Sequence, residues 1–255
     1  MSFDNHGEPS FVRPRWPAPP NIRALCTTRF GGVSHPPWAS LNLGDHVGDD
    51  SAHVQENRKK LASACNLSPE AFGWLSQVHG TNAVALPASP EGLIPEADAS
   101  YTEAAGIACA ILSADCLPVI LCDYDGTTVA AAHAGWRSLA GGVLENLVAQ
   151  LGLPGHRLMA WLGPAIGPDV FEVGPEVKAA FVAHSPLAAE AFSMAGARSG
   201  HYLADIYLLA RQRLEAMGVE QIFGGGFCTV TDSQRFYSYR RDGQTGRMAT
   251  IIWKN

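Results

Sequence analysis

Hydrophobic residues along the chain gather in short runs that are separated by polar turn residues. Runs of about four to eight apolar residues are typical of strands, whereas a helix needs about ten or more. The turn at 123–126, with the sequence Asp-Tyr-Asp-Gly, predicts an antiparallel hairpin between the runs on either side of it. The pattern predicts strands at residues 22–28, 72–78, 82–86, 107–112, 117–122, 128–133, 158–162, 221–223, 236–239 and 248–253.

Longer segments have apolar residues at helical spacing, and these predict four helices and one short helical turn. The helices are expected at residues 50–65, 139–151, 175–184 and 203–217, and the turn begins at Ser68. Asp50 or Ser51 can cap the first helix, and Gly152 ends the second. Adjacent strands followed by helices and further strands indicate an α+β fold rather than a doubly wound parallel sheet.

The start of the chain differs from the rest in its pattern. Residues 1–20 carry four prolines close together and are expected to form a flexible lead-in without regular structure. No linker of distinct composition divides residues 21–255, so we expect this part to be a single domain.

Composition and charge exclude several classes of protein. The chain has 255 residues, of which 47% are hydrophobic, and its net charge is -6 at pH 7. This composition excludes intrinsic disorder for most of the chain, and the charge argues against nucleic acid as the main partner. No membrane-spanning segment or signal peptide is visible, and the six cysteines include no CxxC pair. We therefore expect a cytoplasmic protein that does not insert into membranes.

Three residues that can bind a metal ion lie at the ends of predicted strands: His79, Cys116 and His133. Two imidazoles and one thiolate leave one position of a tetrahedral zinc site open, which is typical of catalytic zinc. Asp115, beside Cys116, could orient a ligand or act as an acid or base. The spacing alone also allows the alternative that Cys116 is a core residue and that His79 lies in an ordinary turn.

Arginines form the second group of candidates. Arg29 lies in a glycine-rich loop, and its guanidinium could bind a phosphate or a carboxylate. Arg240 and Arg241 follow a predicted strand, in which neighbouring side chains point to opposite faces. One of the two could therefore enter a pocket, and the alternative is that both lie on the surface of a hairpin. His46 could also approach such a pocket.

Six segments in a fixed order identify a family that the chain resembles. They are 27–34 (TTRFGGVS), 41–44 (LNLG), 77–80 (QVHG), 114–118 (ADCLP), 132–137 (AHAGWR) and 236–243 (FYSYRRDG). Together they resemble the YfiH-type laccase-domain family over residues 22–253. The resemblance implies one domain, related to a bacterial toxin deamidase, with mixed sheets packed between helices. We therefore expect an α+β fold with largely antiparallel sheets.

The resemblance also implies chemistry. Members of the family have been labelled polyphenol oxidase, peptidoglycan editing factor and purine nucleoside phosphorylase. Their metal, usually zinc, is held by residues that match His79, Cys116 and His133. It follows that this chain is expected to bind zinc, with copper as the alternative, and to act on a small-molecule substrate. We expect a monomer or a small homo-oligomer.

The leading hypothesis is a zinc-dependent purine nucleoside enzyme. It would phosphorolyse adenosine, inosine and methylthioadenosine and would deaminate adenosine. Arg29 is the first candidate for binding phosphate, with Arg240 or Arg241 as alternatives. The remaining candidates are Gln77 and Asp115, for hydrogen bonds to the base or to a metal-bound water, and Asn42, for substrate binding.

Three other hypotheses stay open. Cys116 and His133 could form a thiolate–imidazole pair that acts without metal as an amidase on peptidoglycan precursors. A copper-dependent polyphenol oxidase is a second alternative, although the chain has no paired histidines of the H-x-H type. The third is a binding protein without enzymatic activity, whose metal would have no exchangeable position.

Overall fold

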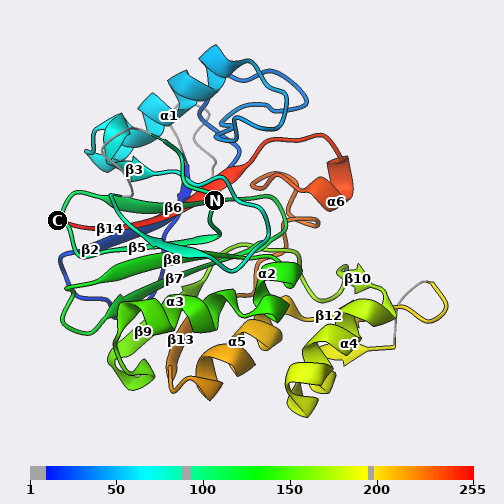
Figure 1. The fold of residues 1–255 in the computed structure, drawn as a ribbon. Coiled ribbons are helices and arrows are strands. Elements are labelled where there is room, and N and C mark those ends of the chain that lie inside the picture. Colours follow the sequence, from blue (N-terminus) through cyan, green and yellow to red (C-terminus); the bar gives the residue numbers. More distant parts are fainter. Residues whose placement is uncertain (1–9, 88–92, 195–197) are drawn as a thin grey trace.

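The structure is a computed structural model that describes residues 10–87, 93–194 and 198–255. Its frame consists of two large sheets that lie one above the other, with helices on both outer sides (Figure 1). The upper sheet has the strand order β1 (Phe11–Val12), β2 (Ile22–Thr27), β14 (Met248–Lys254), β6 (Ala108–Ser113) and β3 (Phe72–Gly73). The lower sheet has the order β13 (Gln221–Gly224), β9 (Leu158–Leu162), β7 (Leu117–Asp123), β8 (Val129–Ala134), β5 (Ala99–Thr102) and β4 (Ala83–Ala85).

Helices cover the outer faces of the two sheets. One helix, α1 (Ser51–Cys65), lies on the upper sheet, while α3 (Val143–Leu151) and α5 (Ile206–Ala216) lie under the lower one (Figure 1). A small sheet of β10 (Glu172–Val173), β12 (Tyr202–Ala204) and β11 (Phe192–Ser193) stands to one side with α4 (Pro175–His184). The remaining elements are α2 (Trp136–Gly141), α6 (Tyr239–Asp242) and the 3-10 turns η1 (Pro69–Ala71), η2 (Gly155–Arg157) and η3 (Pro186–Ala191).

The two-residue period of the strands builds three apolar layers. In β6, Ile111 faces the space between the sheets, where it joins a cluster with Ile120 of β7, whereas Ala110 faces Leu61 of α1. In β7, Leu121 faces the opposite side from Ile120 and joins the cluster under the lower sheet. Every strand at the centre of the fold is therefore buried on both faces, which explains its continuous apolar sequence.

The fold confirms the expected mixed α+β domain with largely antiparallel sheets. The predicted hairpin is present, because β7 pairs antiparallel with β8 and places Pro118 opposite His133. Among the named strands of the described residues, parallel pairing is confined to β3 with β6, β4 with β5 and β13 with β9. The predicted helix at 175–184 has the bounds of α4.

Several element predictions were wrong in detail. The expected strand at 236–239 is absent: Ser238 caps a short helix, α6, by accepting a hydrogen bond from the Arg241 backbone. The expected helix at 139–151 is divided at Gly142, whose φ of 97° ends α2 before α3 begins. Residues 203–204 belong to β12, because Asp205 caps α5 and so fixes its start. The strand expected at 72–78 ends at Gly73.

The lead-in is also more ordered than the sequence suggested. Phe11 and Val12 form β1, which pairs with Thr27 and Cys26 of β2, so the expected lack of regular structure is wrong at this point. The part of the lead-in at 1–9 lies outside the described residues. All six cysteines are free thiols. None of the helices in the described ranges combines the length and the apolar character that crossing a bilayer requires.

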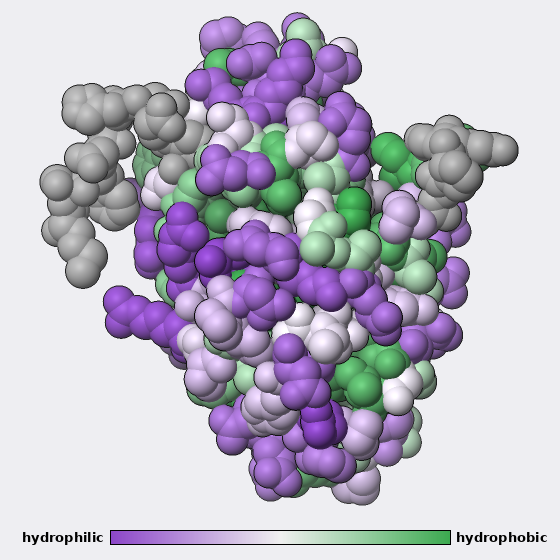
Figure 2. Space-filling view, turned by 90° about the vertical axis from the view of Figure 1, so that its left-hand side faces the viewer, coloured by the Kyte–Doolittle hydropathy of each residue, from purple (hydrophilic) through white to green (hydrophobic). Residues whose placement is uncertain are grey.

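Figure 2 shows the face that lies at the left of Figure 1. Hydrophilic residues predominate there, and hydrophobic residues occur in small groups between them. The large apolar clusters belong to the interior, on both sides of each sheet.

Candidate active site

Two loops and the end of one strand bring the predicted metal ligands together. His79 lies between β3 and β4, Cys116 joins β6 to β7, and His133 is near the end of β8. Their ligand atoms all lie within 4.8 Å of one another. Nε2 of His79 is 3.8 Å from Sγ of Cys116, close to the separation of about 3.5 Å that tetrahedral zinc would impose. The donor set fits a zinc or copper ion.

A buried carboxylate outside the ligand set holds both histidines. Asp98, which is fully buried, lies 2.8 Å from Nδ1 of His133 through its Oδ1 atom. The same carboxylate accepts hydrogen bonds from the backbone N–H groups of Val78, His79 and Gly80. Because Nδ1 of His133 bonds to Asp98, Nε2 is the ring nitrogen left for a metal. From the sequence, this kind of orienting role is expected of Asp115, whereas the fold gives it to Asp98, which carries no distinctive sequence signal.

Two residues of the site have backbone conformations that side chains rarely adopt. The φ angle is 60° at His79 and 87° at Asp115, both in the left-handed region. Hydrogen bonds hold each residue in place: His79 donates its N–H to Asp98, and Asp115 accepts from Thr229 and from the Arg240 backbone. Backbone strain that is held in this way clusters at functional sites.

The centre is packed too closely for a side chain at one neighbouring position. A Cβ atom at Gly135 would lie 3.0 Å from Sγ of Cys116 and 3.2 Å from Cδ2 of His79. The strand register causes this contact, because Leu117 and Ala134 are paired and their neighbours therefore face each other. Glycine at this position lets the backbone approach the ligands.

The ligands shift each other's pKa. Burial alone would raise the pKa of the Cys116 thiol, but the charge and hydrogen bonds of His133 and His79 outweigh burial and lower it to about 6. Burial alone would lower the pKa of His133, but the Cys116 thiolate and Asp98 outweigh it and raise that pKa to about 9. Near neutral pH the pair is a thiolate and an imidazolium when no metal is bound, so the thiolate that a metal needs is already formed.

The three ligands line a cavity of about 520 Å³. Other lining residues supply an indole ring (Trp136), a phenol ring (Tyr239), an imidazole (His46) and three guanidinium groups (Arg137, Arg240 and Arg247). Asp115 is the one carboxylate among the residues that line it. The cavity is thus apolar and aromatic on some sides and cationic on others, with the metal-ligand set exposed to it.

The structure places some predicted residues in this cavity. Gln77, Asp115 and Arg240 all line it, and so does His46. The amide of Gln77 also binds the backbone of Leu112 through both its oxygen and its nitrogen. Gln77 and Asp115 therefore have structural hydrogen bonds in addition to any contact with a substrate.

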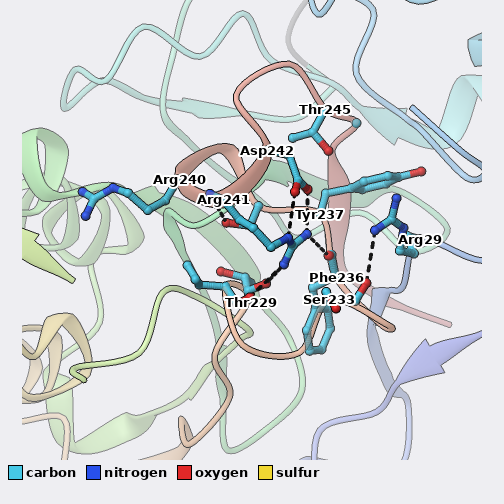
Figure 3. A network of polar contacts seen from close by, with 12 residues as sticks. Arg29, Thr229, Ser233, Phe236, Tyr237, Arg240, Arg241, Asp242 and Thr245 are labelled. Atoms are coloured by element: carbon cyan, nitrogen blue, oxygen red, sulfur yellow. Dashed lines mark hydrogen bonds and ion pairs between the residues drawn. The ribbon is translucent and has the colours of Figure 1, made fainter. Parts of the chain in front are cut away.

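Other predicted residues do not reach the cavity. The guanidinium of Arg29 donates to the carbonyls of Ala39 and Ser233 and lies 5.0 Å from the centre of the Tyr237 ring. Arg241 points into its own loop, where it binds carbonyl oxygens and Asp242 (Figure 3). Arg240 extends away from Arg241 in the same view.

Asn42 is buried behind the cavity rather than in it. Its side-chain oxygen accepts hydrogen bonds from the backbone of Gly44 and of Arg247, 2.9 Å away in the second case. Arg137 and Arg247, which line the cavity, were not singled out from the sequence. Arg137 directly follows Trp136 within the segment 132–137, and this place in a family segment could have marked Arg137 as a candidate.

Comparisons with known proteins agree with this architecture. Residues 23–255 match a family described as multi-copper polyphenol oxidoreductase laccase. Purine nucleoside phosphorylase PA4543 of Pseudomonas aeruginosa is 54% identical, covering 96% of this chain and 98% of that protein. Purine nucleoside phosphorylase YfiH of Escherichia coli is also 54% identical, over 95% and 98%. The crystal structure of Neisseria meningitidis protein NMB0706 has a TM-score of 0.91 at 49% identity, covering 96% and 99%.

The fold and the His–Cys–His cavity thus define a laccase-like enzyme domain. The chain belongs to this polyphenol oxidoreductase laccase family, and its curated relatives carry the name purine nucleoside phosphorylase.

Proposed function

We propose that the protein cleaves purine nucleosides with inorganic phosphate and releases the base and ribose 1-phosphate. The observation that carries this proposal is the shared cavity, in which the metal-ligand set, an indole ring and three arginines face the same space. Phosphorolysis needs a cationic site for the attacking anion and a surface that can hold the flat base as it departs, and this cavity offers both. The names of relatives with 54% identity support the same reaction.

In this reaction a phosphate oxygen attacks C1′ of the ribose while the bond from C1′ to the purine nitrogen breaks. The electron pair of that bond leaves with the purine, which then takes up a proton. Trp136 offers a ring against which the base can stack. Gln77 donates one amide hydrogen to Leu112, and no described residue accepts the second, which can donate to the base. Asp115 is our candidate for moving the proton.

His79, Cys116 and His133 are the residues that would hold zinc, or copper as the alternative. A bound ion would supply a Lewis acid beside the substrate. Asp98 sets the ring orientation of His133, and Gly135 gives the backbone room beside the thiolate. We extend the proposal to methylthioadenosine as a substrate and to deamination of adenosine, since both belong to the activities that the family resemblance implies.

Incubation of the purified protein with adenosine or inosine and phosphate tests the proposal. Chromatography should detect adenine or hypoxanthine together with ribose 1-phosphate. With adenosine, formation of inosine or hypoxanthine would report deamination. The His133→Ala variant should lose both reactions. Absence of all these products, or equal activity in the parent and in His133→Ala, would contradict the proposal.

A second candidate is a cysteine amidase that acts on peptidoglycan precursors. The observation in its favour is the chain of contacts from Cys116 to His133 to Asp98, which matches the order of a thiol, a base and a carboxylate that orients the base. Metal removal separates the two candidates. Amide hydrolysis that persists after complete chelation would favour the amidase, whereas nucleoside cleavage that needs the metal would favour the phosphorylase.

A third candidate is the copper-dependent oxidation of phenols that the family description names. Within the described ranges, one group of three residues can hold a metal ion, whereas a multi-copper oxidase holds several ions. Phenol turnover in proportion to the bound copper would support this candidate.

We also propose that the substrate is a small molecule, that the protein is cytoplasmic and that it is a monomer or a small homo-oligomer. Light scattering coupled to gel filtration measures the mass in solution. A large assembly, or retention on immobilised nucleic acid at physiological salt, would contradict this part of the proposal.

A further inference from the structure

The arginine residues that line the cavity have no carboxylate partner among the described residues, unlike most of the arginines elsewhere in the structure. In the part of the chain that the structure describes, six arginines pair with carboxylates: Arg58, Arg157, Arg198, Arg213, Arg235 and Arg241. No described carboxylate lies within ion-pair distance of Arg137, Arg240 or Arg247. The cavity therefore holds three guanidinium groups that form no direct ion pair with a described carboxylate.

The one carboxylate in the cavity wall is already used elsewhere. Oδ1 of Asp115 accepts a hydrogen bond from Thr229 at 2.5 Å, and Oδ2 accepts one from the Arg240 backbone at 2.7 Å. Asp115 thus fixes the start of α6 and does not pair with any of the three guanidinium groups. A group of cations without directly paired carboxylates in a concave site attracts an anionic ligand.

Arg247 is the most firmly held of the three arginines. Its backbone N–H donates to Asn42, and one terminal nitrogen, Nη1, donates to the carbonyls of Thr245 and Gly246. Gly44 packs on its stem, because a Cβ atom there would lie 2.8 Å from Cγ of Arg247. The described residues accept no hydrogen bond from its Nε or Nη2, so these two donors remain for a ligand.

We propose that Arg247 is the anchor of an oxyanion subsite in this cavity and that the ligand is inorganic phosphate. The inference rests on the proposed phosphorolysis and deepens it by replacing Arg29 with Arg247 as the principal phosphate contact. A guanidinium with Nε and one terminal nitrogen free can bind two phosphate oxygens side by side. Arg137 and Arg240 line the same cavity and contribute further charge.

Burial and charge around Arg247 agree with this role. Burial lowers the pKa of its guanidinium, because the charged form loses hydration, and the charges of Cys116, Asp115 and Tyr239 act in the opposite direction. Arg247 lines the same cavity as His79, Cys116 and His133. A bound phosphate would supply hydrogen bonds and negative charge to a guanidinium that has lost part of its hydration. It would do so beside the proposed reaction centre.

Asn42 and Gly44 hold Arg247 in its position. They belong to the segment 41–44, which lies more than two hundred residues away along the chain, and both contact Arg247 directly. Asn42 is therefore a positioning residue: it acts on the anion through Arg247. A variant at Asn42 should weaken phosphate binding only while Arg247 is present.

Calorimetric titration of the metal-loaded protein with inorganic phosphate, without nucleoside, tests the subsite. Arg247→Gln should weaken phosphate binding by about 10- to 100-fold, because a charge-assisted pair of hydrogen bonds is lost. The matched control is Arg211→Gln. Arg211 also lacks a carboxylate partner among the described residues and donates to the carbonyls of Ile222 and Gly224, but it lies outside the cavity wall. This variant should bind phosphate like the parent.

A double-variant cycle tests the positioning role. Asn42→Ala should weaken phosphate binding by itself, whereas adding it to Arg247→Gln should cause little further loss. Additive effects of the two substitutions would overturn the proposed link. The melting temperature of each variant identifies one that fails to fold, and Arg247→Lys then provides a milder change, which should retain partial affinity.

The outcomes also separate this inference from the proposed function. Phosphate affinity in Arg247→Gln equal to that of the parent would overturn the subsite, even if the parent cleaves nucleosides. Loss of phosphate affinity in Arg247→Gln, together with no nucleoside cleavage by the parent, would retain the subsite and reject phosphorolysis.

Discussion

Asp98 and His133 are joined by a contact of 2.8 Å between Oδ1 and Nδ1, buried under the site cavity. The same carboxylate fixes the backbone at His79, so one side chain determines the placement of two of the three candidate ligands. Asp98 precedes β5 and His133 lies on β8, and these strands pair with Ala99 opposite Ala132. The register of the sheet therefore places Asp98 next to His133.

Replacement of Asp98 by Asn should weaken metal binding by about 10- to 100-fold. With its amide nitrogen toward His133, the new side chain would require an unprotonated Nδ1 and hence a protonated Nε2, which cannot bind a metal. With the amide reversed, its N–H groups would face the backbone N–H groups of Val78 and Gly80. Competition with a chromophoric chelator measures the affinity, and Co²⁺ absorption reports the coordination geometry.

Asp123→Asn is the matched control for that experiment. Asp123 is also a buried carboxylate that accepts backbone hydrogen bonds, from Thr127 and Thr128, but it ends β7 away from the cavity. Its variant should lose stability and keep the metal affinity of the parent. Equal metal affinity in the two Asn variants would show that Asp98 has no orienting role.

The candidate ligand residues could be singled out from the sequence, and the structure brings them together, whereas the groups that position them could not be found in this way. His79, Cys116 and His133 stand in distinctive segments at strand ends. Asp98, by contrast, lies in an ordinary acidic stretch, and its role depends on the pairing of β5 with β8. Strand pairing over long distances is not encoded in the local pattern of apolar residues, so the contact became visible only in the fold.

The same limit applies to the arginines. Arg29 looked suitable for phosphate because it stands beside glycines, yet the loop folds so that its donors meet the carbonyls of Ala39 and Ser233. The sequence around Arg247 does not indicate a binding role, because the residues that surround its side chain come from 42–44 and from α6. The 236–239 segment looked like a strand for its aromatic residues, but the Ser238 cap starts a helix.

The metal-free protein should depend on pH through the Cys116–His133 pair. The pKa of Cys116 is lowered from 9.0 to about 6, so its contribution is complete above pH 9 and is lost as pH falls through about 6. The pKa of His133 is raised from 6.5 to about 9, so its contribution is complete below pH 6.5 and is lost as pH rises through about 9. Each shift requires the charged form of the partner, so loss of either charge removes the stabilisation that the other provides. The stabilisation by the pair should therefore be greatest between about pH 6.5 and 9, where both groups are charged in the folded protein.

Melting temperatures of the chelated parent and of chelated Cys116→Ala, measured from pH 5 to pH 10, test this prediction. The difference between the two proteins should form a plateau near neutral pH and shrink on both sides. A difference that rises steadily with pH, or that does not change, would contradict the thiolate–imidazolium pair.

Substitution of Gly135 by Ala should disturb the metal site more than the fold. The added methyl group would lie 3.0 Å from Sγ of Cys116, so the thiolate must shift by a few tenths of an ångström. We expect weaker metal binding and an altered Co²⁺ spectrum, with a small change in the melting temperature of the chelated protein. Unchanged metal affinity would mean that the three ligands have room to move and are not held rigidly.

Arg29→Gln separates a structural arginine from a substrate-binding one. The substitution removes hydrogen bonds to Ala39 and Ser233 and the contact with the Tyr237 ring, which join the loop after β2 to the segment before α6. We expect the free energy of unfolding to fall by about 1–3 kcal/mol, while KM for phosphate stays within twofold of the parent. Urea unfolding and steady-state kinetics at varied phosphate provide the two measurements. A large rise in KM for phosphate without loss of stability would instead place Arg29 in contact with the anion, as its glycine-rich loop first suggested.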